Sequence, residues 1–375
     1  MNVGILSMQR VQNWGSFLQA FALKKTVEEL RHECSFLDIK RGVGLTEQEV
    51  MAAKERCKIR VSKRASDFIS YCLDGKLFVC LKAKIHLRRF KKKYNQECLP
   101  MLGIDENRYE DDKPFDLVII GSDEVFNCAQ PRAAWGHTLH LFGEGINAKK
   151  IITYAASFGY TTIGDLERLG LKERIIKALE KVSTFSVRDM NSYSIIEQLT
   201  GKKPELCVDP TMMFDFSSYM PSKVPIENYL IVYTYQGRIA DPKIIKAIKD
   251  FAVLKKKTIV SLSSYYSCCD QCIIADTPFE LLSYFANADY IVTDTFHGTI
   301  FSIKYDRNFC AIVRDTNAQK LGSLLNQFKL ANRIVKIPAD IKCKFEEGID
   351  YTDTNSILDE EAKKAKAYLK EAICL

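Results

Sequence analysis

The segment TDTFHGTIFS, residues 293–302, places a histidine, a glycine and hydroxylated residues where an apolar run gives way to a helix-like pattern. The first turn of a helix has unpaired backbone N–H groups and partial positive charge, so it favours a bound anion. We therefore expect His297 and the N–H groups of Gly298 and Thr299 to form a cradle for an anionic group. The alternative is that His297 only packs within the first turn of the helix.

Polar residues also follow three other strand-like runs: GSDE (121–124) after DLVII, SFG (157–159) after ITYAA and RD (188–189) after TFSV. The carboxyl ends of parallel strands meet at one edge of a sheet, where such folds bind ligands. Arg188 has the planar fork that pairs with a carboxylate or a phosphate. The alternative is a local ion pair between Arg188 and Asp189.

Acid–base chemistry near neutral pH is within reach of the same residues. Histidine titrates near neutral pH without a large pKa shift, which makes His297 a candidate general acid and base. Carboxylates take protons from hydroxyl groups when burial raises their pKa, so Asp123 and Glu124 are candidate bases, with Asp294 behind them. The alternative for Asp123 is a cap on a following helix.

The loop SMQRVQNWGSF follows the first strand-like run and precedes a helical pattern. Asn13 and Gly15 would let the backbone approach a ligand closely, and Trp14 has a ring that can stack on a sugar. These three residues are our candidates for binding a sugar.

Short β-branched runs alternate with amphipathic helical patterns, which is typical of parallel α/β layers. We expect two Rossmann-like domains that face a cleft. The first is expected over 1–208, with a basic helical insertion at about 47–100. The second is expected over 209–350, and a helix over 351–375 is expected to cross back to the first. The strands are expected at VGILS, CSFLDI, FDLVIIGS, KIITYAAS, TFSVRD and ELCVDP, then at NYLIVYTY, KTIVSLS, DYIVTDT, NFCAIV and NRIVKI.

The composition, 47% hydrophobic and 27% charged over 375 residues, is that of a globular protein. No run approaches the roughly 18 apolar residues of a membrane span. MNVGILSMQR reads as a strand and not as a signal peptide, so we expect a cytoplasmic protein with reduced cysteines. The cluster CCDQC (268–272) has no second cysteine pair at zinc-site spacing, so we expect no metal site.

The net charge of +7 is concentrated in one segment. Residues 51–100 hold 14 Lys and Arg against four acids, a net +10, and Leu77, Leu81 and Ile85 recur there at helical spacing. One interpretation is a solvated helix packed on the first domain. The other is attraction of segment 54–93 to an anionic membrane, at the inner face of which the protein would be peripheral. No recognisable nucleic-acid-binding fold accompanies the positive charge, so we expect no nucleic-acid partner.

Six motifs occur in order: NWGSFLQAFALKKTVEEL, VIIGSDEVFN, YAASFG, SVRD, VDPTMMF and TDTFHGTIFSIKYDRNF. Together they resemble the polysaccharide pyruvyl transferase family over roughly residues 1–335. The family's usual second motif is close to GSDQVWN, where this chain has Glu124 and Phe126. Better-studied members have an arginine two residues before the histidine, where this chain has Thr295.

The resemblance implies a GT-B-like glycosyltransferase architecture and transfer of pyruvate from phosphoenolpyruvate to a sugar diol as a ketal. Phosphoenolpyruvate would then be a co-substrate, with no further cofactor. The implied donor site comprises the SVRD arginine, Thr295 and the residues around the histidine, and the acceptor is a sugar that is either free or lipid-linked. Two alternatives stay open: a GT-B enzyme that uses a nucleotide sugar, and a silent relative that binds glycans or lipids.

Overall fold

The computed structural model describes residues 1–40, 45, 77–109, 113–129, 138–235, 237–314 and 317–374, with the backbone alone for 77–80. The chain divides into two compact units, each described here by itself. Unit 1 comprises Met1–Leu73, Leu99–Phe214 and Glu360–Leu375. Unit 2 comprises Asp74–Cys98 and Asp215–Asp359.

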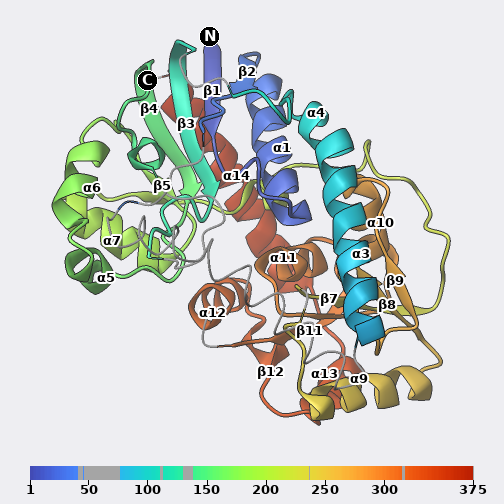
Figure 1. The fold of residues 1–375 in the computed structure, drawn as a ribbon. Helices are drawn as coiled ribbons and strands as arrows, with labels where there is room; N and C mark the ends of the chain where they lie inside the picture. Colours follow the sequence, from blue (N-terminus) through green and yellow to red (C-terminus); the bar gives the residue numbers. More distant parts are fainter. Residues whose placement is uncertain are drawn as a thin grey trace. The chain divides into compact units, whose positions relative to one another are not determined.

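Among the described residues, unit 1 contains a parallel sheet of six strands in the order β2-β1-β3-β4-β5-β6 (Figure 1). The order reverses between β1 and β3, and ligands bind at such a switch point in open α/β sheets. The strands are β1 (Asn2–Leu6), β2 (Glu33–Phe36), β3 (Phe115–Asp123), β4 (Ala148–Ala156), β5 (Ser186–Val187) and β6 (Glu205–Leu206).

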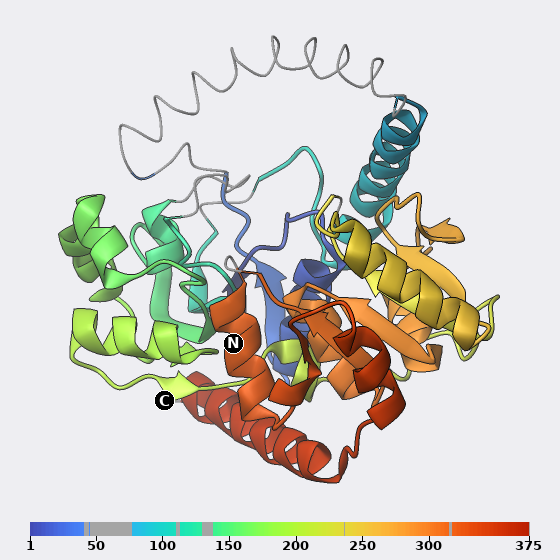
Figure 2. The ribbon, with the colours of Figure 1, turned by 90° about the horizontal axis from the view of Figure 1, so that it is seen from below.

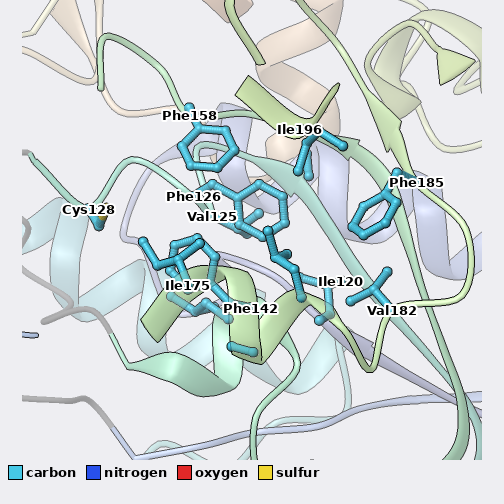
Figure 3. Close-up of a cluster of buried hydrophobic side chains, with 14 of the residues drawn as sticks. Ile120, Val125, Phe126, Cys128, Phe142, Phe158, Ile175, Val182, Phe185 and Ile196 are labelled. Atoms are coloured by element: carbon cyan, nitrogen blue, oxygen red, sulfur yellow. The ribbon is translucent and has the colours of Figure 1, made fainter. Parts of the chain in front are cut away.

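The helices of unit 1 cover the sheet. Helices α5 to α7 pack against the face that presents Val118 and Ile120. On that face Phe126 stacks on Phe142, with ring centroids 4.9 Å apart, and lies 5.0 Å from Phe158 (Figure 3). The helices are α1 (Trp14–Glu29), α4 (Leu99–Met101), α5 (Ile163–Arg168), α6 (Lys172–Leu179), α7 (Met190–Thr200) and α8 (Pro210–Met213), with a short helical turn at Leu139–Phe142. The helical turn at Tyr94–Cys98 belongs to unit 2.

Unit 2 contains a second parallel sheet of six strands over its described residues, in the order β12-β11-β10-β7-β8-β9. Here the order reverses between β7 and β10. The strands are β7 (Tyr229–Tyr233), β8 (Thr258–Leu262), β9 (Gln271–Ile273), β10 (Tyr290–Thr293), β11 (Asn308–Ile312) and β12 (Ile334–Val335).

The helices of unit 2 follow its strands. They are α9 (Pro242–Leu254), α10 (Pro278–Asn287), α11 (Phe296–Lys304), α12 (Ala318–Gln327) and α13 (Asp340–Glu347), with a helical turn at Ala331–Arg333. The basic helix α3 (Leu77–Lys93) also belongs to this unit. Its Lys93 pairs with Asp276, and its His86 ring lies 6.4 Å from that of Tyr265. We expected the basic insertion to belong to the first domain; the described part belongs to the second unit, and residues 46–76 lie outside the described residues.

Helix α14 (Thr352–Cys374) is one continuous helix (Figure 2). Its residues from Glu360 onward group with unit 1, where the Tyr368 hydroxyl donates to the Thr153 carbonyl oxygen at 2.9 Å. The unit boundary falls between Phe214 and Asp215, a few residues beyond the expected boundary at 208. The short helix α8 keeps residues 209–214 packed on unit 1 beside α1, where Phe214 contacts Phe21.

Candidate active site

The switch point of unit 1 is lined by polar side chains from β1, α1 and β3. The Gln19 amide bridges the two strands, because its Nε2 donates to Ser7 Oγ at 3.0 Å and its Oε1 accepts from Ser122 Oγ at 2.7 Å. The Ser7 hydroxyl in turn donates to the Ser122 carbonyl oxygen. Gly121 permits this turn, since its φ is +119° and a Cβ there would lie 2.2 Å from the Tyr154 carbonyl oxygen. These hydrogen bonds fix the polar side chains at the carboxyl ends of β1 and β3.

Asp123 ends β3 at this edge in a left-handed conformation, with a φ of +77°. Its carboxylate accepts three hydrogen bonds: from Ser16 Oγ at 2.8 Å, from the Glu124 N–H at 2.9 Å and from Arg188 at 3.3 Å. The described residues 124–129 contain no helix, so the capping alternative for Asp123 is wrong. A non-glycine residue with positive φ is uncommon and collects at functional sites.

Arg188 is buried between two carboxylates, with its side chain only 3% exposed. Nη2 lies 3.3 Å from Asp123 Oδ1, and Nη1 lies 3.1 Å from Asp209 Oδ2. Burial acts to lower the pKa of Arg188, but Asp123 and Asp209, with Glu124 and Asp189 nearby, raise it above the ordinary value. The expected local pair with Asp189 is not what the structure shows, since Asp189 instead caps α7 through the Ser192 N–H. Arg188 thus links the carboxylate at the end of β3 to the carboxylate that precedes α8.

Glu124 follows Asp123 and accepts from Asn127 Nδ2 at 2.7 Å. Phe126, at the position of the family's aromatic residue, is fully buried in the core of unit 1. Its ring therefore contributes to packing.

Asn13, Trp14 and Gly15 start α1 beside the same edge. Asn13 is the helix cap, and its Oδ1 accepts from the Gly15 N–H at 2.9 Å. Trp14 is 1% exposed, so its ring is buried and the face that stacking on a sugar requires is covered. The structure therefore gives this tryptophan a packing role where we expected a stacking one.

In unit 2, the turn from β10 into α11 is closed by its own side chains. Thr295 caps the helix, because its Oγ1 accepts from the Gly298 N–H at 3.0 Å. The Thr299 N–H donates to the Thr295 carbonyl oxygen. The expected anion cradle from the N–H groups of Gly298 and Thr299 is therefore wrong, since both groups already donate within the turn. His297 lies in this first turn, 7% exposed, with its ring 6.0 Å from Phe301.

Two arginines that the sequence analysis did not single out converge at this turn. Arg314 follows β11, and its Nη2 lies 3.0 Å from Asp294 Oδ2. Arg238 follows β7, and its Nη1 lies 3.9 Å from the same oxygen. The Asp294 side chain is fully buried, whereas both arginines are partly exposed. We call Arg238, Asp294 and Arg314 the arginine cluster; it carries two positive charges against one negative charge at the switch point between β7 and β10.

Neighbouring side chains hold the arginine cluster in place. Asn317 ties two of its loops together, because its Nδ2 donates to the Asp294 carbonyl oxygen at 2.7 Å and its Oδ1 accepts from the Arg314 N–H. The Arg238 guanidinium lies 4.2 Å from the centre of the Tyr235 ring. Both arginines follow strands that the sequence pattern predicted, so a search for charged residues after every strand would have found them.

Two further findings concern the described residues alone. No group of three or more His, Cys, Asp or Glu side chains there is arranged to hold a metal ion. Nor does any helix in those ranges combine the length and apolarity needed to cross a membrane.

The family model for polysaccharide pyruvyl transferase matches residues 13–316, a span that includes Asp123, Arg188 and the arginine cluster. The chain belongs to the polysaccharide pyruvyl transferase family. A comparison of this pyruvyl transferase family member with curated proteins gives no match.

Solved structures show what the fold of this family member is similar to. A candidate UDP-N-acetylglucosamine 2-epimerase from Listeria monocytogenes has a TM-score of 0.50 at 8% identity, over 98% of this chain and 95% of that one. The likeness concerns the fold alone, an α/β fold of two Rossmann-like units of the GT-B type.

Two further structures match at lower scores. UDP-GlcNAc 2-epimerase from Neisseria meningitidis, bound to UDP-GlcNAc, has a TM-score of 0.49 at 9% identity over 100% of both chains. An O-GlcNAc transferase variant from Thermobaculum terrenum has a TM-score of 0.40 at 11% identity; 99% of this chain is covered but only 64% of that one.

Proposed function

We propose that this protein transfers pyruvate from phosphoenolpyruvate to two hydroxyl groups of a sugar, forming a ketal in surface-polysaccharide biosynthesis. Family membership supports this proposal, and the arginine cluster is the observation that carries it. Phosphoenolpyruvate has a phosphate and a carboxylate. A partly exposed cluster with net positive charge attracts such a ligand, and guanidinium groups pair with both anions.

The proposed donor residues therefore differ from those the sequence suggested. Arg238 and Arg314 would bind the two anionic groups, with His297 on the neighbouring turn. Arg188 already has two carboxylate partners, so a donor anion would have to compete with Asp123 and Asp209 for it. Thr295 would act through its cap, which shapes the turn that carries His297.

The proposed reaction adds a proton to C3 of phosphoenolpyruvate, which turns the methylene group into a methyl group. One sugar hydroxyl oxygen then forms a bond to C2, the bond from C2 to the phosphate oxygen breaks, and the second hydroxyl oxygen bonds to C2. Of the two hydroxyl protons, one balances the proton on C3 and the other leaves with phosphate. His297 would deliver the proton to C3, since imidazole serves as acid and base near pH 7.

Asp123 and Glu124 are the proposed acceptors of the hydroxyl protons. The positive φ of Asp123 supports a functional role, because such backbone strain persists mainly where the site requires it. Ser16 and Arg188 would fix the orientation of this carboxylate. Asn13 and Gly15 would lie beside the acceptor, with Trp14 supporting them from the core.

Thermal stabilisation by phosphoenolpyruvate tests the donor assignment without a known acceptor. A ligand at 100 times its Kd adds about 2.7 kcal/mol to the stability of the native state. We expect phosphoenolpyruvate to raise the Tm of the wild type, and Arg238→Gln and Arg314→Gln to lose this shift. Arg168→Gln, which removes an exposed arginine elsewhere, is the matched control and should keep it.

Three results would contradict the proposal. A Tm shift with UDP- or GDP-sugars but not with phosphoenolpyruvate would point to a glycosyltransferase. A shift that survives in both cluster variants but vanishes in Arg188→Gln would restore the donor site to Arg188. The absence of any shift would favour the silent relative.

We further propose that the acceptor is lipid-linked and that α3 contacts an anionic membrane surface. Leu81 and Leu87 on this helix are 53% and 43% exposed, among many lysines and arginines. Attraction to anionic lipids contributes about 1 kcal/mol per basic residue near the surface. Residues 54–76 of the proposed segment lie outside the described residues.

A further inference from the structure

Unit 2 has a cavity of about 450 Å³ that lies apart from the turn carrying His297. It lies between α3 and the loop that connects β8 to β9, two segments that run side by side (Figure 1). We call it the α3 cavity. It is lined by Lys82, Ile85, His86, Arg89, Tyr265, Tyr266, Ser267, Cys269, Asp270 and Cys272.

The fixed charges of the α3 cavity favour an anion. Lys82 and Arg89 stand on the same face of α3, two helical turns apart. Among the described residues that line it, Asp270 is the one carboxylate, and its Oδ2 accepts the Ile259 N–H at 2.8 Å. Two cations therefore face a single carboxylate that already serves to fix the start of β9.

The neutral groups of the α3 cavity suit a ligand rich in hydroxyl groups. Its lining includes Tyr265, Tyr266 and Ser267, all of which carry hydroxyl groups. The His86 ring lies 6.4 Å from that of Tyr265, and its Nε2 is a buried atom with no hydrogen-bond partner among the described residues. Burial, with Arg89 nearby, lowers the pKa of His86, so its ring is neutral at pH 7 and can accept a hydrogen bond from a hydroxyl group.

The α3 cavity is also connected to the arginine cluster. The Tyr266 hydroxyl donates to the Tyr235 carbonyl oxygen and accepts from the Arg238 N–H at 3.1 Å. A side chain that lines the cavity therefore holds the loop that carries Arg238. A ligand in the cavity would contact Tyr266, whose hydroxyl group is hydrogen-bonded to that loop.

We propose that the α3 cavity binds an anionic saccharide, a sugar unit with a carboxylate or phosphate group, as part of the acceptor. Lys82 and Arg89 would pair with the anionic group, and His86, Tyr265 and Ser267 would bind the hydroxyl groups. The role as part of the acceptor rests on the proposed function, but binding in the cavity does not. The acceptor would then be an acidic polysaccharide repeat, or a sugar phosphate such as the first sugar of a lipid-linked chain.

Ligand-observed NMR with glucuronate, glucose 6-phosphate, neutral glucose and inorganic phosphate tests this proposal on the full chain. We expect the two anionic sugars to bind at least about tenfold more tightly than glucose or phosphate, because a charged hydrogen bond adds to the sugar contacts. The variant Lys82→Gln/Arg89→Gln should weaken them about tenfold or more. Lys84→Gln/Arg88→Gln removes the same charge from exposed positions of the same helix and should leave binding within about twofold of the wild type.

The relative affinities of glucuronate and glucose 6-phosphate show whether the cavity favours a sugar with a carboxylate group or a sugar with a phosphate group. Equal binding of glucose, equal binding of inorganic phosphate, or an equal loss in both double variants would each overturn the proposal. So would UDP binding that depends on Lys82 and Arg89 while neither anionic sugar binds. The Tm shift by phosphoenolpyruvate should persist in both double variants, so a failed cavity and a failed donor site give different results.

Discussion

Arg188 shows how unit 1 accommodates a buried charge. A guanidinium without partners in the protein interior costs several kcal/mol, and here two carboxylates, Asp123 and Asp209, offset that cost. Asp209 is itself fully buried and also caps α8 through the Thr211 N–H. Each of the three charges is therefore stable only because the others are present.

This mutual dependence predicts a non-additive result. Arg188→Met should lower the free energy of unfolding by about 3–5 kcal/mol, because it leaves the buried Asp209 carboxylate without its cation. Asp209→Ala should cost less, because Arg188 keeps Asp123 as a partner. The double variant should lose less than the sum of the two, by about 1–3 kcal/mol. Urea denaturation of the four proteins measures this coupling. If the two single changes in the free energy of unfolding simply add up in the double variant, Arg188 and Asp209 do not stabilise each other.

Gly298 is predicted to be required by the turn that carries His297. A Cβ at this position would lie 2.3 Å from Thr293 Oγ1 and 2.6 Å from Thr295 Oγ1. Gly298→Ala should therefore lower stability by about 1–3 kcal/mol, the usual cost of overpacking. Gly322→Ala is the matched control: it lies within α12 with open space around it, and should stabilise by about 0.5–1 kcal/mol. Equal changes in the two variants, measured by thermal denaturation, would refute this account.

Cys268 is predicted to react as a thiolate at lower pH than an ordinary cysteine. A hydrogen bond with Cys269 lowers the pKa of Cys268, despite burial that acts to raise it. The thiolate is then the main form above this lowered pKa, so alkylation by iodoacetamide should reach half its maximal rate below pH 8.5, the usual thiol value. Cys269→Ala removes the hydrogen bond and should move the midpoint up. Mass spectrometry of the peptide that contains Cys268, with free cysteine as reference, measures the alkylation rate at each pH. A midpoint that is the same in the wild type and in Cys269→Ala would contradict the prediction.

At the level of elements, α3 carries two distinct surfaces. Its Lys82, His86 and Arg89 line the α3 cavity, and Lys93 pairs with Asp276. Other basic residues of the same helix are exposed, as are Leu81 and Leu87. The helix can therefore hold a ligand on one face while the other stays open.

The open face predicts binding to anionic vesicles. Sedimentation with vesicles that contain phosphatidylglycerol should bring down the wild type, and phosphatidylcholine vesicles should not. Replacing four exposed basic residues by glutamate should abolish binding and leave the Tm shift by phosphoenolpyruvate unchanged. Equal binding to both kinds of vesicle, or binding that persists in the variant with four reversed charges, would argue that α3 is only a solvent-exposed helix. The four residues are Lys84, Arg88, Lys91 and Lys92.

At the scale of the whole molecule, the alternation of β-branched and amphipathic segments was enough to predict the fold. The sequence pattern did not predict strand β9, because it has three residues, of which Gln271 and Cys272 lie in the cysteine cluster and only Ile273 is β-branched. The amphipathic pattern over 164–182 forms two helices, α5 and α6, because Gly170 adopts a left-handed conformation between them. The grouping of α3 with unit 2 depends on contacts such as His86 with Tyr265, which no local pattern contains.

The candidate site was predictable only in part, for a related reason. The sequence places His297 and Asp123 at strand ends, but it does not show which N–H groups a cap already uses. Thr295 occupies the Gly298 N–H, which removed the expected cradle. Arg238 and Arg314 are separated by dozens of residues and become neighbours only through the strand order of the sheet.

Unit 1 is discontinuous, and this has a consequence for how the protein is made. Its sheet is complete by Phe214, but Glu360–Leu375 belongs to the same unit and brings the buried Tyr368 and Leu369. A ribosome adds about 5–20 residues per second, so roughly 7–30 seconds separate the synthesis of these two parts. During that interval the nascent sheet has no partner for the face that α14 covers. Unit 2, by contrast, is synthesised in full before α14 can close the core of unit 1.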